Sequence, residues 1–181
     1  MLKATLACFA AALVCGPALA SPESEAYVGG LIERLHQVDQ GAEADFIVDN
    51  VDMPRVSNFV LGKYARETSG DDYKLFTARL DRFLREFLGS RSEELSSADL
   101  RILSSVDRTE TDSIVTTRIS SPTREPMTMR WRVLHRDGAW RLIDVEVHGL
   151  WLAIEQRAQI MALLDKQDTQ IADLYFVAST D

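Results

Sequence analysis

The chain has 181 residues, 27% of them charged, and a formal net charge of −8. Nucleic acids and anionic membrane surfaces repel an acidic protein, so the composition disfavours nucleic-acid binding and passive membrane adhesion, although a locally basic docking face stays compatible with it. The length predicts one domain that buries a core of its own.

Residues 1–20 have the pattern of a cleaved signal peptide. Lys3 gives a positive start, residues 6–14 form a short apolar run, and Ala18-Leu19-Ala20 is a small-x-small cleavage site. The apolar run is too short to span a bilayer, which takes about 20 apolar residues. We therefore expect Sec-dependent export, cleavage after Ala20, and a single mature domain over residues 21–181 in the periplasm of a bacterium.

Both cysteines, Cys8 and Cys15, lie within this segment. The mature chain therefore has no disulfide, thiolate nucleophile or zinc-thiolate site. Cys15 allows the alternative of a lipoprotein, but Val14 stands where the lipobox has a small residue, so cleavage after Ala20 is favoured.

The first half of the mature chain has apolar residues at helical spacing. We expect helices over residues 21–40, 42–50 and about 53–64, the third with Asp52 as its N-cap and Pro54 in its first turn. Asp71 is expected to cap a longer helix over about 72–91. The broad apolar face of that helix carries Phe76, Leu80, Phe83, Leu84, Phe87 and Leu88.

After Ala98 the apolar period changes to two, which predicts strands. Four are expected, over about 100–106, 113–119, 128–135 and 140–147, with Asp137-Gly138 as a hairpin turn between the last two. A final helix is expected over 150–167, and a short apolar element over 171–177. This order predicts an α+β fold in which helices pack on one face of a curved, four-stranded antiparallel sheet.

The ionisable residues give little support for catalysis. His36, His135 and His148 lack metal-ligand spacing, and no nucleophile or phosphate-binding motif occurs. Asp144 is the carboxylate most in need of explanation, because strand alternation places it on one face with Trp140 and Leu142.

We expect a structural ion pair between Asp144 and Arg130, Arg132 or Arg157, since a buried carboxylate needs a partner. An isomerase or hydrolase that uses Asp144 with Tyr64 or His148 is the alternative.

Aromatic residues are numerous for a sheet of four strands. Such residues usually form an ordinary core, and an adaptor with a filled interior is one hypothesis. A curved sheet cupped under helices also leaves space for an apolar small-molecule pocket. The residues concerned are Phe76, Phe83, Phe87, Trp131, Trp140, Trp151, Tyr175 and Phe176.

Three segments together resemble a known family. They are Val60-Leu61-Gly62-Lys63-Tyr64, the helix with Phe76, Leu80 and Leu84, and Trp140-Arg141-Leu142-Ile143-Asp144-Val145 followed by Glu146, Gly149 and Arg157. In this order, over residues 27–177, they resemble the MlaC family of periplasmic phospholipid-binding proteins, also called toluene-tolerance or ABC-transporter auxiliary proteins. The chain departs from that pattern at Trp151, where the family has a small hydroxyl residue.

The resemblance implies a nuclear-transport-factor-like cup whose apolar cavity holds lipid acyl chains. It implies a monomeric carrier without catalysis, metal or cofactor that shuttles phospholipid between an outer-membrane lipoprotein complex and an inner-membrane ABC transporter with an MCE-domain subunit, and so serves outer-membrane lipid asymmetry. A carrier of another lipid, such as a hopanoid, is the alternative. The expected lining residues are Leu61, Tyr64, Phe76, Leu80, Phe83, Phe87, Trp131, Val133, Val145, Val147, Leu150, Trp151 and Ile154.

Overall fold

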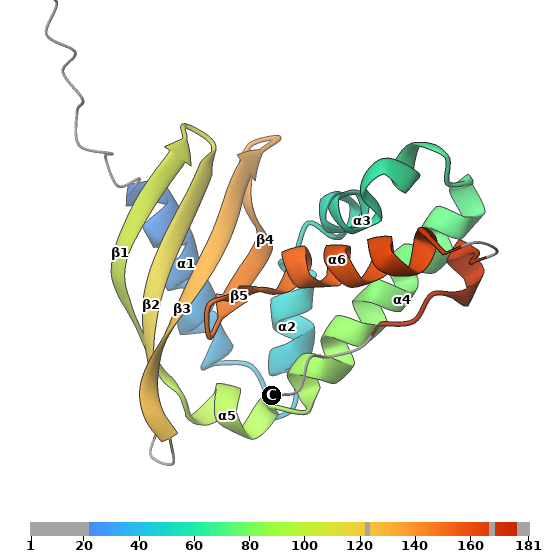
Figure 1. Cartoon of the computed structure of the whole chain (residues 1–181). Helices are drawn as coiled ribbons and strands as arrows, with labels where there is room; N and C mark the ends of the chain where they lie inside the picture. Colours follow the sequence, from blue (N-terminus) through green and yellow to red (C-terminus); the bar gives the residue numbers. More distant parts are fainter. Residues whose placement is uncertain (1–21, 122–123, 167–168, 177–181) are drawn as a thin grey trace, which may run out of the picture.

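The computed structural model describes residues 22–121, 124–166 and 169–176 (Figure 1). The expected signal peptide lies outside these ranges. The elements in chain order are α1 (Pro22–Leu35), α2 (Glu43–Asp49), α3 (Met53–Leu61), η1 (Gly62–Arg66), α4 (Gly70–Gly89), α5 (Ser92–Ser97), β1 (Asp99–Thr109), β2 (Asp112–Ser121), β3 (Arg124–Arg136), β4 (Ala139–Val147), β5 (Leu150–Trp151), α6 (Leu152–Leu164) and η2 (Ile171–Asp173).

The sheet is an antiparallel meander in the order β1-β2-β3-β4-β5, which confirms the predicted α+β fold. The predicted number of four strands is wrong, because β5 adds a fifth. His148 and Gly149, with φ of 52° and 82°, turn the chain tightly enough for Leu150 to pair with Val147. A strand of two residues is too short to show the alternation of apolar and polar residues that predicts a strand.

Turn and cap signals were read correctly at two positions. Asp137 and Gly138 have φ of 52° and 79°, as a two-residue hairpin turn with two positive φ angles requires. Asp52 caps α3 by accepting a hydrogen bond from the Arg55 backbone N–H at 3.1 Å. The prediction that Asp71 caps the long helix is wrong, because α4 begins at Gly70 and Ser69 accepts the Asp72 N–H at 3.1 Å.

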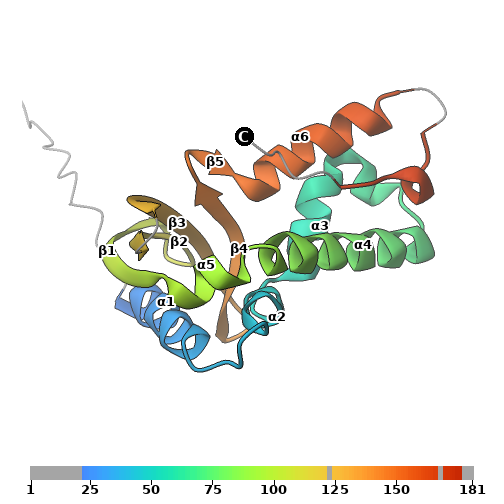
Figure 2. The same ribbon diagram turned by 90° about the horizontal axis from the view of Figure 1, so that it is seen from below.

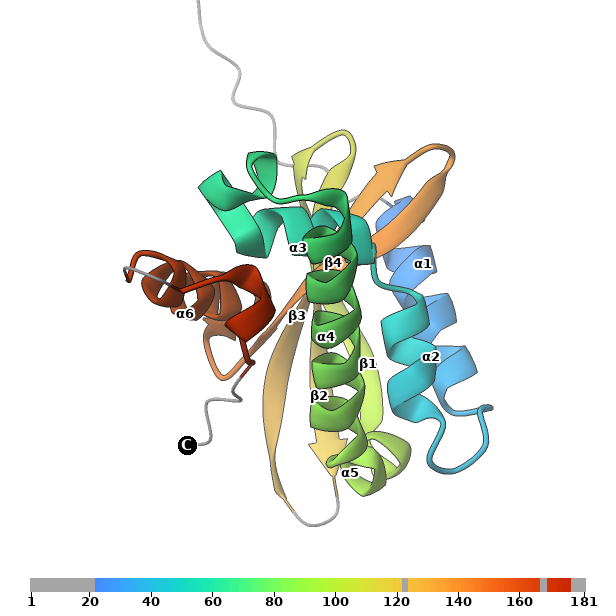
Figure 3. The same ribbon diagram turned by 90° about the vertical axis from the view of Figure 1, so that its right-hand side faces the viewer.

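The apolar interior divides into two clusters. The sheet with α1 and the layer of α3, α4 and α6, which carry most of them, lie side by side (Figures 1 and 3). The sheet cluster joins the inner face of the sheet to α1 and α2, and contains Val28, Ile32, Leu35, Ile47, Ala98, Leu100, Val115, Met129, Trp131, Val133 and Leu142. The helical cluster joins α3, α4, α6 and the C-terminal segment, and contains Val56, Val60, Leu61, Phe76, Leu80, Ala153, Ile160 and Leu174.

The link between α2 and α3 connects the clusters. Val51 packs against both of them and forms a parallel bridge with Leu142 of β4. The Asp52 N–H donates to the Leu142 carbonyl at 2.9 Å, and the Leu142 N–H donates to the Asn50 carbonyl at 3.1 Å. The sheet is therefore joined to the helical half through the free side of β4. Among the described helices, none is long and apolar enough to cross a membrane.

Candidate functional site

The inner face of the sheet becomes progressively less covered towards β5. Met129, Val147 and Leu150 lie opposite one another across β3, β4 and β5. Met129 is 7% exposed, Val147 is half-buried, and Leu150 is 49% exposed. The helical cover over this apolar face therefore ends between β3 and β5, and the surface beyond it is available to an apolar ligand.

The second half of α4 offers a matching apolar surface. Phe83, Leu84, Phe87 and Leu88 are all half-buried. Leu84 packs against the helical cluster, whereas Leu88, one turn later, packs against the sheet cluster. In the view from below, α4 and α6 lie on the side of β4 away from α1 (Figure 2). We define the boundary surface as the partly covered apolar residues of α4, β4 and β5: Phe83 and Leu84, which pack against the helical cluster, Leu88, Val145 and Val147, which pack against the sheet cluster, and Phe87 and Leu150.

The residues predicted to line a lipid site separate into three groups. Leu61, Phe76 and Leu80 are buried in the helical cluster, and Trp131 and Val133 are buried in the sheet cluster. Their burial is already explained by packing within the protein. The structure brings the other apolar residues to partly open surfaces, where Phe83, Phe87, Val145, Val147 and Trp151 are half-buried and Leu150 and Ile154 are exposed.

Tyr64 lies apart from these groups. Its hydroxyl donates to Asp165 Oδ1 at 2.5 Å, and Lys63 Nζ lies 2.8 Å from the same oxygen. This contact joins η1 to the C-terminal end of α6, so Tyr64 takes part in helix packing.

Trp151 belongs to the charged outer face of the sheet. It lies opposite Glu146, which forms an ion pair with Arg130, and the Arg130 guanidinium lies 5.3 Å from the centre of the Trp151 ring. Leu150, on the other face of the same strand, is the residue that continues the inner apolar face.

Asp144 caps the first turn of α6 from β4, since Trp151 is the N-cap residue by position, and it does not form the predicted ion pair. Its Oδ1 accepts the backbone N–H groups of Val145 and Ala153, each at 2.8 Å. Burial raises the pKa of Asp144 to about 6, although the two N–H donors and the nearby Arg132 act in the opposite direction.

The three expected arginine partners of Asp144 are engaged elsewhere. Arg130 pairs with Glu146, Arg132 pairs with Asp112 at 2.8 Å, and Arg157 donates to the Phe59 carbonyl. The alternative catalytic pairs are not assembled either, because Tyr64 bonds to Asp165 and His148 is exposed. Asp144 therefore has a structural explanation in the described part of the chain.

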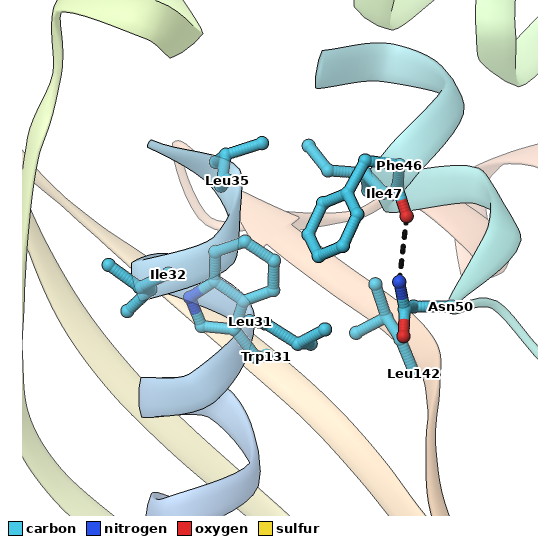
Figure 4. A pocket seen from close by; sticks show the side chains of 8 residues that line it. All are labelled: Leu31, Ile32, Leu35, Phe46, Ile47, Asn50, Trp131 and Leu142. Atoms are coloured by element: carbon cyan, nitrogen blue, oxygen red, sulfur yellow. Dashed lines mark hydrogen bonds between the residues drawn. The ribbon is translucent and has the colours of Figure 1, made fainter. Parts of the chain in front are cut away.

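A small enclosed pocket lies between α1, α2 and the sheet (Figure 4). Its volume is about 10 Å³, room for roughly one water molecule. The walls are Leu31, Ile32, Leu35, Phe46, Ile47, Asn50, Trp131 and Leu142, and the Asn50 side-chain amide donates to the Phe46 carbonyl at 2.8 Å. A lipid chain does not fit this pocket, so it belongs to the packing of the sheet cluster.

A larger groove of about 570 Å³ runs between α3 and the β3–β4 hairpin. Its wall is mixed. Six of the twelve lining residues are charged, namely Asp52, Arg55, Arg132, Arg136, Asp137 and Asp144, and they alternate with apolar residues such as Val56, Phe59 and Ile143. The charged side chains make this groove less suited to acyl chains than the boundary surface, which carries none. Among the described residues no cluster of His, Cys, Asp or Glu could hold a metal ion.

Leu84 and Leu88 of the boundary surface, and Phe176 beside it, are not among the expected lining residues. Leu84 and Leu88 belong to the predicted apolar face of α4, but alternation and helical spacing do not say which of its residues stay partly uncovered. Phe176 was grouped with the aromatic surplus only. It stacks on Phe83 with a ring-centre distance of 5.5 Å, because the C-terminal segment folds back over α4.

Comparison with known proteins gives a consistent assignment. The model of the family described as MlaC protein matches residues 37–175. A solved structure of a phospholipid-binding protein from Ralstonia solanacearum, in complex with a phospholipid, superposes with a TM-score of 0.66 at 14% identity, covering 80% of this chain and 87% of that one. No curated protein sequence matches the chain.

Proposed function

Since the chain belongs to the MlaC family, we propose that it is a phospholipid carrier that holds acyl chains at the boundary surface and catalyses no reaction. One observation assigns the acyl chains to the boundary surface. The apolar inner face of the sheet continues beyond its helical cover, from buried Met129 to Leu150 at 49% exposure. A soluble domain gains nothing in water from an uncovered apolar face, whereas an acyl chain covers it.

Such a carrier must shield acyl chains from water, and it needs no reactive group to do so. Two acyl chains contain roughly 30 methylene groups, and each costs about 0.8 kcal/mol when left in water. A surface of Phe, Leu and Val side chains from α4 and β4 removes that cost without any reactive group. The phospholipid in the complex of the R. solanacearum protein, which has the same fold, supports phospholipid as the cargo.

The setting that we propose is the periplasm. The signal-peptide pattern of residues 1–20 supports export, and family membership supports transfer between an outer-membrane lipoprotein complex and an inner-membrane ABC transporter with an MCE-domain subunit. The direction of transfer then depends on the relative lipid affinities of the partners.

Native mass spectrometry of gently purified protein tests the carrier function. We expect the mass of the mature chain plus one or more phospholipids, and uptake of phospholipid by delipidated protein from vesicles. A bare polypeptide that takes up no lipid would refute the proposal.

A pair of leucine variants tests the location of the site. Leu150→Asp places a charge on the uncovered inner face and should abolish lipid uptake. Leu103→Asp, at a leucine that is 55% exposed on β1, is the matched control and should retain it. Both leucines are about half exposed, so both variants should fold. Equal uptake by the two variants would move the site elsewhere.

A further inference from the structure

A row of aromatic rings follows α4 through the proposed lipid site. Phe76 and Phe83 both contact the Phe176 ring, at 5.3 and 5.5 Å between centres, and Phe83 stacks on Phe87 at 5.9 Å. Phe76 is 1% exposed and Phe87 is half-buried, so the row leads from the interior towards the surface.

Only the outer part of this row can take a lipid. Phe76 is 1% exposed and already packed in the helical cluster, whereas Phe83 and Phe87 are half-buried. Arg91 follows Phe87 by four residues, about one helical turn. An acyl chain that lies on Phe83 and Phe87 therefore has its polar end beside Arg91.

Arg91 places a positive charge next to Phe87, the last ring of the row. Its guanidinium lies 4.0 Å from the centre of the Phe87 ring and is held there by Nη1, which donates to the Phe87 carbonyl at 2.9 Å and to Ser90 Oγ at 3.2 Å. The side chain is half-buried, and both of these acceptors are neutral.

Arg91, which lies just beyond the end of α4, differs in this respect from Arg85 of that helix. Arg85 lies within 2.8 Å of three carboxylates, those of Asp45, Asp49 and Asp81. Among the described side chains, no carboxylate pairs with Arg91, and neither Nε nor Nη2 has an acceptor. Packing against the helix end explains the bonds from Nη1 but leaves these other donors unused.

A partly desolvated guanidinium without a counter-ion is unfavourable, and a phosphodiester supplies what is missing. Its two unesterified oxygens accept a bidentate pair of N–H bonds, a geometry that a guanidinium provides and an ammonium does not. We propose that Nε and Nη2 of Arg91 bind the phosphate group of a phospholipid whose acyl chain lies on Phe83 and Phe87 of α4. This inference rests on the proposed carrier function, and it makes Arg91 the residue that selects phospholipids over uncharged lipids.

The test compares uptake of two lipids by delipidated protein. Wild type, Arg91→Gln, Arg91→Lys and Arg82→Gln are each incubated with either dioleoylphosphatidylglycerol or dioleoylglycerol, presented in micelles of an uncharged detergent so that no other lipid phosphate competes, and bound lipid is measured by native mass spectrometry. Arg82 is an exposed residue of α4 and serves as the matched control.

We expect Arg91→Gln to weaken phospholipid binding by about 10- to 100-fold, the size of a lost charge-assisted hydrogen-bond pair, and to leave dioleoylglycerol binding unchanged. Arg91→Lys should recover only part of the loss, and Arg82→Gln should match wild type. Equal phospholipid binding by Arg91→Gln and wild type would overturn the role of Arg91. Absence of lipid from every protein, wild type included, would instead overturn the carrier function.

A titration with inorganic phosphate distinguishes a phospholipid headgroup from free phosphate as the anion that Arg91 binds. Calorimetric titration of the delipidated wild type with millimolar phosphate should show no binding, because the acyl chain supplies most of the affinity. Phosphate binding that depends on Arg91, with undiminished phospholipid uptake by Arg91→Gln, would assign the site to a free anion and overturn the headgroup role.

Discussion

At the scale of single residues, Asp144 is a buried carboxylate, which is unfavourable, and it accepts backbone hydrogen bonds at the start of α6. The residue is 8% exposed, and burial raises the pKa of its carboxyl group to about 6. The same group accepts two backbone N–H bonds, one of them from the first turn of α6. Buried N–H groups at a helix start need an acceptor, so the cap explains why an acidic side chain is kept here.

Substitution of Asp144 should distinguish a cap from a catalyst. Asparagine keeps the accepting oxygen and alanine removes it, so we expect Asp144→Ala to be less stable than Asp144→Asn by about 1–2 kcal/mol. Urea unfolding measures this difference. Asp71→Ala, at an exposed residue of α4, is the control and should stay within about 0.5 kcal/mol of wild type. Folded Asp144→Asn should still take up phospholipid; a stable variant that had lost this capacity would contradict the structural role.

The raised pKa of Asp144 predicts a pH dependence with a definite sign. Between pH 4 and 6 the folded protein holds a proton on Asp144 that the unfolded chain releases, so low pH favours the folded state. The free energy of unfolding of wild type minus that of Asp144→Asn should therefore fall as the pH rises through about 6, by at most about 3 kcal/mol. Urea titrations of both proteins at pH 4.5, 6 and 7.5 measure this difference. A difference that is constant or grows with pH would exclude the raised pKa.

At the scale of elements, the contact between α3 and α6 depends on one glycine. Gly62 ends α3 with φ of 57° and ψ of −123°, a conformation that L side chains rarely adopt. A Cβ atom there would lie 2.8 Å from Arg157 Nη2 and 2.9 Å from Met161 Sδ, both on α6. The glycine thus permits the turn and the close approach of the two helices at once.

We expect Gly62→Ala to destabilise the protein by about 1–3 kcal/mol, because both backbone strain and overpacking oppose the methyl group. Gly70→Ala is the matched control, since a Cβ at Gly70 meets no atom within 4 Å and its φ is not positive. That change should be neutral or slightly stabilising. Thermal unfolding of the two variants makes the comparison, and equal melting temperatures would show that α6 moves away at little cost.

At this scale, some features of the fold can be predicted from the sequence alone and others cannot. The Asp137-Gly138 turn and the Asp52 cap are local, so their side chains specify them without help from the fold. Helix α5 was missed because its six residues include a single apolar one, Leu95, and strand β5 because it has only two residues; neither segment is long enough to show a period. The sequence does not say which of the expected lining residues stay uncovered, because Trp131 and Leu150 are both apolar strand residues of the inner face. Only the positions of α1, α2 and α4 decide that Trp131 is covered and Leu150 is not.

At the scale of the whole molecule, the two clusters behave as two partial cores. The helical cluster and the sheet cluster share Val51 at their junction, and α4 contributes to both through Leu84 and Leu88. A single core of this chain length would bury Phe83, Leu84 and Val147 more completely. We infer that an acyl chain at the boundary surface completes the apolar interior and joins the two halves.

Hydrogen exchange should therefore localise the effect of the cargo. Loading delipidated protein with phospholipid stabilises the folded state as a whole by mass action, and adds local protection where the chain lies. We expect the largest gain in residues 83–88 of α4 and 143–151 of β4 and β5, and only the global gain in α1, which packs on the far part of the sheet. The Leu150→Asp variant in the same vesicles is the control and should show no gain. Protection that rose most in α1 and β1 would place the lipid on the other side of the sheet cluster and refute the boundary surface as the site.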